Sequence, residues 1–218
     1  MDEAAPAVED PEPENQPAEQ ESLRDQRLSA VETALTQSGA RRVLDLGCGP
    51  GALLQRLLAD SYELIVGVDV SVRALEQAAR RLKLDEMHER QRRRIELFQS
   101  ALTYRDRRLL GFDAAALVEV IEHLDLPRLA ALEQNVFGSA RPGSVVVTTP
   151  NAEYNDRWAT LSGREFRHPD HRFEWTRAEF AAWGDQVADA YGYSVCYAPV
   201  GSVDPEVGAP TQMAVFRR

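Results

Sequence analysis

The chain has 218 residues, is 44% hydrophobic and carries a formal net charge of −10. This length and composition allow one substantial core, so we expect a single folded domain. No apolar run approaches the roughly eighteen residues that a membrane helix needs, and Cys48 and Cys196 are too few for a disulfide framework. We therefore expect a cytoplasmic protein with no membrane partner and with two reduced thiols.

Residues 1–21 differ in composition from the rest of the chain. They contain eight acids, four prolines and no base, a composition typical of a disordered tail or linker. Without these eight acids, 27 acids remain against 25 bases, so the expected folded domain, residues 22–218, is almost neutral. The acidic total therefore does not argue against a nucleic-acid partner, because binding depends on local patches.

The remaining sequence alternates between helical and strand patterns. Helices are expected at 23–35, 52–59, 71–82, 127–137 and 176–190, the first of them closed by Gly39 and the third capped by Ser71. Strands are expected at 41–46, 63–68, 95–98, 112–118, 144–149, 193–200 and 211–216. Alternation of this kind indicates an α/β, Rossmann-like fold with a mostly parallel seven-stranded sheet, and the last two strands form an antiparallel hairpin at one edge.

Two segments stand out as candidate interaction surfaces. Residues 80–94 are rich in arginine, contain Lys83, the only lysine of the chain, and are expected to be exposed. Residues 150–173 are polar and aromatic without clear periodicity, which is typical of a functional loop.

A glycine loop follows the first strand. Gly47, Gly49 and Gly51 directly follow Asp45 and Leu46, so the backbone can approach a ligand without side chains in the way. Asp69 ends the second strand, where a carboxylate can accept hydrogen bonds from the ribose hydroxyls of an adenosine cofactor. Ser100, just after the third strand, is a candidate contact to the adenine or else a simple turn residue.

The same glycines fit a dinucleotide-binding pattern, so NAD has to be weighed against S-adenosylmethionine. Asp45 would repel a pyrophosphate but suits the cationic end of S-adenosylmethionine. No tyrosine precedes Lys83 by four residues, so the Tyr-x-x-x-Lys pair of a short-chain dehydrogenase is absent. We therefore expect S-adenosylmethionine as the cofactor, bound by Asp45, Gly47, Gly49, Asp69 and Ser100.

A carboxylate and imidazole cluster follows the fourth strand. Glu119, Glu122 and His123 are spaced i, i+3 and i+4, and on a helical turn they would share a face. An ordinary solvated turn would look the same. His168 and His171 in the polar loop could supply a second imidazole, and spacing does not choose between them. Mixed oxygen and nitrogen ligands suit manganese, iron, cobalt or magnesium acting as a Lewis acid, whereas His88 lies among bases and is expected at the surface.

At these residues the sequence resembles the small-RNA 3′-terminal ribose 2′-O-methyltransferase family, especially its bacterial members. The resemblance covers about residues 23–216 and is carried by the segments 41–51, 113–125, 148–155 and 170–177. Gln99-Ser100 departs from the Gly-Ser that is more frequent in the family.

The resemblance implies a class I methyltransferase fold and a metal-dependent reaction. The implied ligands of the divalent metal, manganese or magnesium with cobalt as a further candidate, are Glu119, Glu122, His123 and His171. Bound to both hydroxyls of the terminal ribose, this metal would lower the pKa of the 2′-hydroxyl, which then attacks the sulfonium methyl. One of the histidines could take the proton. The Lys-Asp-Lys-Glu tetrad of other ribose methyltransferases is impossible with one lysine.

The resemblance also implies partners. Bacterial relatives work beside a polynucleotide kinase-phosphatase in RNA repair and carry an amino-terminal half before the catalytic half, so this chain is expected to be a catalytic domain lacking that half. Eukaryotic relatives mark small regulatory RNAs in RNA silencing. Arg157, Trp158, Arg164, Arg167 and Tyr154 are candidate contacts to the RNA 3′ end, although Phe173, Trp175 and Trp183 are equally well explained as core residues.

Two other functions remain open. One is a metal-independent class I methyltransferase that acts on a small metabolite, which chelators would not inhibit. The other is a non-enzymatic RNA-binding module with a vestigial cofactor fold, which would not bind S-adenosylmethionine.

Overall fold

The computed structural model describes residues 21–157 and 166–218. The expected tail, residues 1–21, lies outside the described residues except for Glu21, which contacts Ser29 in the first helix. The strands are β1 (Arg42–Leu46), β2 (Leu64–Asp69), β3 (Ile95–Gln99), β4 (Ala114–Val118), β5 (Ser144–Pro150), β6 (Ser194–Val200) and β7 (Thr211–Arg217). The α-helices are α1 (Leu23–Gln37), α2 (Ala52–Leu57), α3 (Val72–Arg81), α4 (Glu89–Arg92), α5 (Leu126–Glu133) and α6 (Arg177–Tyr191).

The strands form one seven-stranded sheet in the order β3-β2-β1-β4-β5-β7-β6. The first five strands are parallel, and β7 lies antiparallel between β5 and β6. Both the mostly parallel sheet and the antiparallel hairpin at one edge are therefore confirmed, and β6 rather than the last strand of the chain, β7, is the edge strand.

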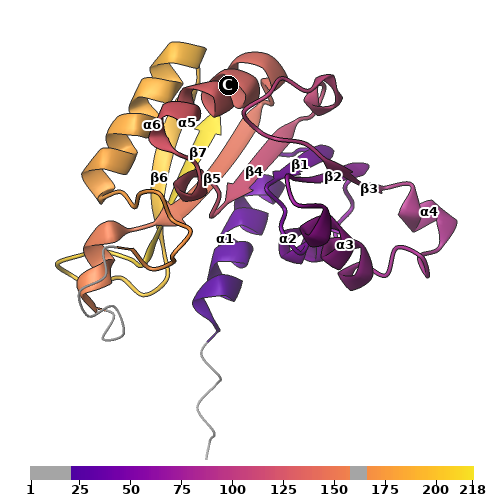
Figure 1. Ribbon diagram of the computed structural model, residues 1–218, viewed down its shortest axis with the longest axis horizontal. Coiled ribbons are helices and arrows are strands. Elements are labelled where there is room, and N and C mark those ends of the chain that lie inside the picture. The colour runs from indigo at the N-terminus through magenta and orange to yellow at the C-terminus, as the bar shows by residue number, and fades with distance from the viewer. Residues whose placement is uncertain (1–20, 158–165) are drawn as a thin grey trace, which may run out of the picture.

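Helices cover both faces of the sheet (Figure 1), with α1, α2 and α3 on one side and α5 and α6 on the other. Side chains that alternate along the strands belong to two hydrophobic cores, one on each face of the sheet. In β4, Ala114 and Ala116 pack with α1 and α2, whereas Ala115 and Leu117 pack with α5 and α6. Strands buried on both faces explain why the sequence shows continuous apolar runs.

Local signals explain where the helices begin. Ser71 accepts a hydrogen bond from the backbone N–H of Ala74 at the start of α3, as expected. Thr176 and Glu179 form a reciprocal capping box at the start of α6. Gly39 has a φ of 69° just after α1, the left-handed conformation that ends helices.

One helix differs from expectation. The segment expected to be helical over 127–137 is an α-helix only to Glu133 and continues as a π-helical turn, η3 (Gln134–Ala140). Gly138 leaves space there that the Gln134 side chain occupies, because a Cβ on Gly138 would lie 2.6 Å from Gln134 Nε2. Among the described residues, no helix is long and apolar enough to cross a membrane.

Candidate active site

The carboxyl ends of β1, β2 and β4 open onto a cavity of about 490 Å³. In a parallel sheet this is the edge where ligands bind. Its lining includes residues from the glycine loop, from the ends of β2 and β3, and from the segment after β4: Gly47, Gly49, Asp69, Val70, Ser100, Leu102, Glu119, Val120, His123, Leu124 and Arg128. Four of the five expected cofactor residues, all except Asp45, therefore share one cavity with Glu119 and His123 of the expected metal cluster.

The glycine loop is shaped by its packing against the segment after β4. Gly47 has a φ of 82°, and a Cβ at this position would lie 2.7 Å from Val120 Cγ2, so no larger residue fits. The backbone N–H of Gly49 donates a hydrogen bond of 2.9 Å to one oxygen of Asp69, and Ser71 N–H donates one of 2.8 Å to the other. These two bonds fix the carboxylate at the cavity wall.

Asp45 lies at the end of β1, directly before this loop, and is only 2% exposed. Among the described residues, no donor reaches its Oδ2. Burial, and to a lesser degree the nearby Asp69, raises the pKa of Asp45 to about 7. A buried carboxylate with an unpartnered oxygen is costly unless a cation or donor completes it, which fits the cationic end of the expected cofactor.

Two further residues complete this half of the cavity. The Ser100 hydroxyl lines it but donates its hydrogen to Asp106 at 2.8 Å, so its oxygen lone pairs are what remains for a ligand. Val70 is 61% exposed beside Asp69, an apolar surface on which a flat base could lie. Sequence reasoning missed Val70, since a valine after a strand carries no distinctive signal.

Glu119 follows β4, and its conformation differs from the expected helical turn. It has a φ of 54°, a left-handed conformation that is strained for a side chain as large as glutamate. A single 3-10 turn, η2 (Ile121–His123), comes next. The expectation that Glu119, Glu122 and His123 share one helical face is therefore wrong: Glu122 is fully buried and His123 is exposed. Strand hydrogen bonding extends to Glu119, whose N–H donates to the Thr148 carbonyl of β5.

Both carboxylates are held by neighbouring polar groups. Glu119 accepts a hydrogen bond from Thr148 at 3.0 Å and pairs with Arg27 of α1 at 3.0 Å. Burial raises the pKa of Glu119 although Arg27 opposes this effect. Glu122 accepts from the Thr149 hydroxyl through Oε2, whereas its buried Oε1 has no donor within the described part of the chain. Burial, followed by the charge of Glu119, raises the pKa of Glu122 well above its ordinary value.

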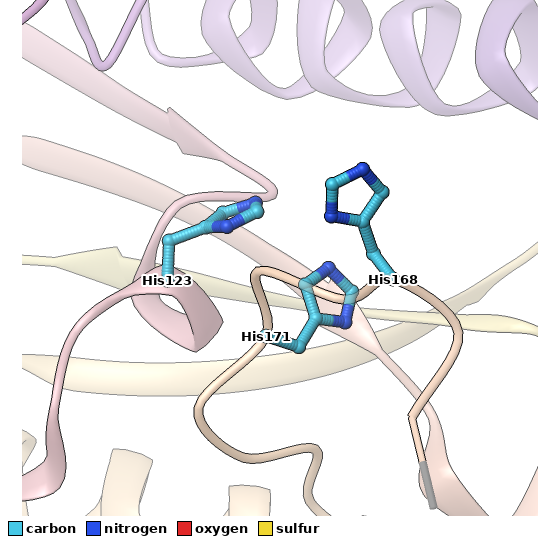
Figure 2. A group of neighbouring side chains, drawn as sticks. All are labelled: His123, His168 and His171. Atoms are coloured by element: carbon cyan, nitrogen blue, oxygen red, sulfur yellow. The ribbon is translucent and has the colours of Figure 1, made fainter. Parts of the chain in front are cut away.

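Three histidines from two segments form a group of close potential metal ligands, which includes neither glutamate. Figure 2 shows His123 of η2 facing His168 and His171, which belong to the loop before α6. Nitrogen atoms of the three rings lie within 4.8 Å of one another. The backbone N–H of Arg172 donates to the Glu122 carbonyl at 2.7 Å, which docks the loop on η2. Both loop histidines therefore reach His123, and the geometry alone does not exclude either one.

Glu174 distinguishes the two loop histidines. Burial would raise the pKa of Glu174, but hydrogen bonds with His171, Asn155 and the Arg167 N–H lower it overall. The ionised carboxylate takes the Nδ1 hydrogen of His171 and leaves Nε2 with its lone pair, the arrangement typical of a metal-bound histidine. His168 Nδ1 instead accepts the exposed N–H of Asp170. The unpartnered Glu122 oxygen and the orientation of His171 both fit a divalent cation.

The structure assigns other roles to several expected RNA contacts. Arg157 pairs with Asp204 and Glu206, and Arg167 donates to Asn155 and to the Asn151 carbonyl. Phe173 and Trp183 are buried core residues, as the alternative interpretation holds. Trp158 and Arg164 lie outside the described residues.

Arg27 is the main residue that sequence reasoning missed. It is partly buried between Glu119 and the Thr211 hydroxyl, yet in the sequence it is one member of a helical pattern. The available signal was its position among the apolar residues of α1, where a solvent-exposed arginine is not expected.

His88 is at the surface, as expected, and accepts the Arg90 N–H. Cys48 and Cys196 are both free.

The strand order, the glycine loop after β1 and the acid at the end of β2 together define a class I S-adenosylmethionine-dependent methyltransferase fold. A family model described as a methyltransferase domain matches residues 44–146. The solved methyltransferase domain of bacterial CtHen1 is 51% identical, with a TM-score of 0.83 over 90% of this chain and 100% of that one. This chain belongs to the small RNA 2′-O-methyltransferase, or Hen1, family.

Other relatives agree with this assignment. The small RNA 2′-O-methyltransferase of Rattus norvegicus is 38% identical over 90% of this chain and 51% of its own length, so the chain spans about half of that curated relative. A chain in the solved Pnkp1/Rnl/Hen1 RNA repair complex shares the fold, with 21% identity and a TM-score of 0.68 over 91% of this chain and 42% of that one.

Proposed function

We propose that this chain transfers the methyl group of S-adenosylmethionine to the 2′-hydroxyl of the 3′-terminal nucleotide of RNA, with the help of a divalent metal. One observation carries the proposal: a single cavity is lined by Gly47, Gly49 and Asp69 on one side and by Glu119 and His123 on the other. A methyl donor held by the first group would meet a ribose held by the second. Relatives named small RNA 2′-O-methyltransferases support the choice of acceptor.

The residues around the glycine loop would bind and orient the cofactor. Asp69 is held by two backbone N–H groups and keeps oxygen lone pairs for ribose hydroxyls of the cofactor. The buried Asp45 supplies negative charge near the cationic end of S-adenosylmethionine. Val70 and Leu102 offer apolar surface for the adenine, and the Ser100 oxygen borders the same space. These residues would hold the cofactor in the cavity that Glu119 and His123 also line.

The proposed metal ligands are Glu119, Glu122, His123 and His171. A divalent metal, manganese or magnesium with cobalt as a further candidate, would supply Lewis acidity that lowers the pKa of a ribose hydroxyl. Glu174 holds His171 in the tautomer that leaves Nε2 free. Arg27 pairs with Glu119 and so offsets part of the negative charge that this carboxylate would offer to a cation. The pKa of His123 is lowered, first by desolvation and then by the nearby His171, which favours the neutral ring that can accept a proton or a metal.

We also propose a role in RNA repair beside a polynucleotide kinase-phosphatase. The support is the fold shared with a chain of the Pnkp1/Rnl/Hen1 RNA repair complex. Methylation of the terminal ribose would protect a repaired end from another cleavage that uses the 2′-hydroxyl.

The proposal can be tested with labelled S-adenosylmethionine and two short RNAs, one with an ordinary 3′ end and one whose terminal ribose is already 2′-O-methylated. We expect label only on the ordinary RNA, only with manganese or magnesium present, and none after chelation. Transfer to RNA that ignores the chelator would contradict the metal mechanism. Binding of S-adenosylmethionine without transfer to either RNA would favour the alternative, a metal-independent enzyme for a small metabolite. Failure to bind S-adenosylmethionine at all would favour a non-enzymatic module.

A further inference from the structure

His168 places a third imidazole beside His123 and His171, the two histidines of the proposed ligand set. The ring centroid of His168 lies 5.9 Å from that of His123 and 5.5 Å from that of His171, and His123 and His171 are 4.9 Å apart. The ligand nitrogens of all three fall within 4.8 Å of one another, and in Figure 2 the three rings surround a common space. A single cation placed in this space could contact three imidazoles.

The three imidazoles are also more accessible to a cation than the two carboxylates. One oxygen of Glu119 accepts from Thr148 and the other is ion-paired with Arg27, and Glu122 is fully buried. His123 and His168 are exposed, and His171 is oriented by Glu174. The only described hydrogen bond of the His168 ring is a long one, 3.2 Å, from the Asp170 N–H. A cation that prefers nitrogen can therefore bind without breaking the Arg27–Glu119 ion pair.

Three imidazoles and one open position are a known arrangement for zinc, which is commonly four-coordinate. Manganese and magnesium prefer oxygen ligands, and zinc binds a given nitrogen-containing site more tightly than manganese does. We infer that the pocket has a second binding mode, in which His123, His168 and His171 hold zinc without the two glutamates. The two modes share His123 and His171, so zinc excludes the metal that the proposed function needs and acts as a competitive inhibitor.

This inference deepens the proposed function, and His168 is the residue that separates the two modes. The test compares Zn²⁺ and Mn²⁺ affinities of the purified wild-type chain with those of His168→Gln and Glu122→Gln, by chelator competition for zinc and by electron paramagnetic resonance for manganese. We expect His168→Gln to weaken zinc binding by about tenfold or more and to leave manganese affinity within about threefold. Glu122→Gln should show the opposite pattern. His88→Gln, at the distant α4, is the matched control and should change neither affinity.

A second readout uses cobalt as a probe of geometry. Cobalt bound by three imidazoles and a water is four-coordinate and absorbs visible light strongly, whereas a six-coordinate mixed site absorbs weakly. We expect an intense visible band for cobalt in Glu122→Gln and loss of that band in His168→Gln. Thermal unfolding of each variant shows that it is folded.

The outcomes separate this inference from the proposed function. Zinc affinity that is unchanged in His168→Gln would overturn the inference, as would variants that weaken both metals equally, because one common site would then explain all binding. If zinc binds through His168 but none of manganese, magnesium and cobalt binds the wild-type chain through the glutamates, the zinc mode stands and the metal requirement of the proposed function fails.

Discussion

Two buried carboxylates, Asp45 and Glu122, each keep an oxygen without a donor among the described residues. A buried charge of this kind is unfavourable unless a counter-charge completes it. Asp45 lies next to the glycine loop, and Glu122 directly precedes His123. The two residues therefore mark the two places where the proposed function puts a cation, the sulfonium cofactor and the metal.

The pKa of Asp45, raised to about 7, predicts a pH dependence of cofactor binding. A cationic ligand favours the ionised carboxylate, so binding should weaken as protonation of Asp45 increases below this pH. We expect the affinity for S-adenosylmethionine, measured by calorimetry, to fall about fivefold from about pH 7 to about pH 6. Asp45→Asn should bind more weakly at the higher pH and lose most of this dependence.

Asp106→Asn is a suitable control for that measurement. Asp106 hydrogen-bonds to Ser100 at the cavity, but Arg108 lowers its pKa to about 2, so it stays ionised throughout this pH range. Its variant can change the affinity but should keep the wild-type pH profile. A profile that is flat in the wild-type chain would show that Asp45 is already ionised by its surroundings.

At the scale of elements, the sequence indicates which residues are candidate metal ligands but not how their backbone is folded. Spacing of three and four residues fits a helical turn, but it equally fits a strand end followed by a single 3-10 turn, as found at Glu119 and η2. The positive φ of Glu119 leaves no mark in the sequence, because glutamate rarely adopts it. The choice between His168 and His171 depends on Glu174, whose contact with His171 is visible only after folding.

The loop before α6 positions His171, and this predicts a specific effect of Glu174. Glu174→Gln removes the charge that holds the His171 ring, so we expect manganese affinity to fall by about tenfold to a hundredfold. Thr176→Ala, two residues later, removes the capping box of α6. It should lower the free energy of unfolding by about 1 kcal/mol and leave manganese affinity unchanged. Equal metal affinities in the wild-type chain and Glu174→Gln would mean that the loop does not position a ligand.

At the scale of the whole molecule, the sheet was largely predictable because strands buried on both faces give unbroken apolar runs, as in Ala114–Val118. The position of β7 between β5 and β6 was harder to predict, because two hairpin strands of similar composition do not reveal which of them pairs with the parallel sheet. Arg27 shows a further limit. It reaches Glu119 across 92 positions of the chain, and no local pattern encodes a contact at that range.

The overall distribution of arginines bears on how RNA is held. Arg27 and Arg157 are neutralised by acids near the site, while the basic stretch 80–94 lies beside the beginning of β3, where Ile95 pairs with Ile65 at the start of β2. Figure 1 shows α4 beyond the β3 edge of the sheet. β2 ends at Asp69 in the cavity, and six residues of strand span about 20 Å. The basic stretch and the site therefore lie at opposite ends of the strands.

This separation predicts that the chain recognises mainly the terminal nucleotides. We expect kcat/KM for an RNA of about six nucleotides to be within about twofold of that for an RNA of about 24, because few additional phosphates meet arginines near the site. The double variant Arg80→Glu/Arg81→Glu should then have the same kcat/KM as the wild-type chain on both RNAs. A strong preference for the longer RNA that this variant abolishes would instead show that the basic stretch binds phosphates distant from the 3′ end. That preference should also decrease with added salt, since each neutralised phosphate of single-stranded RNA contributes about −0.7 to the slope of log affinity against log salt.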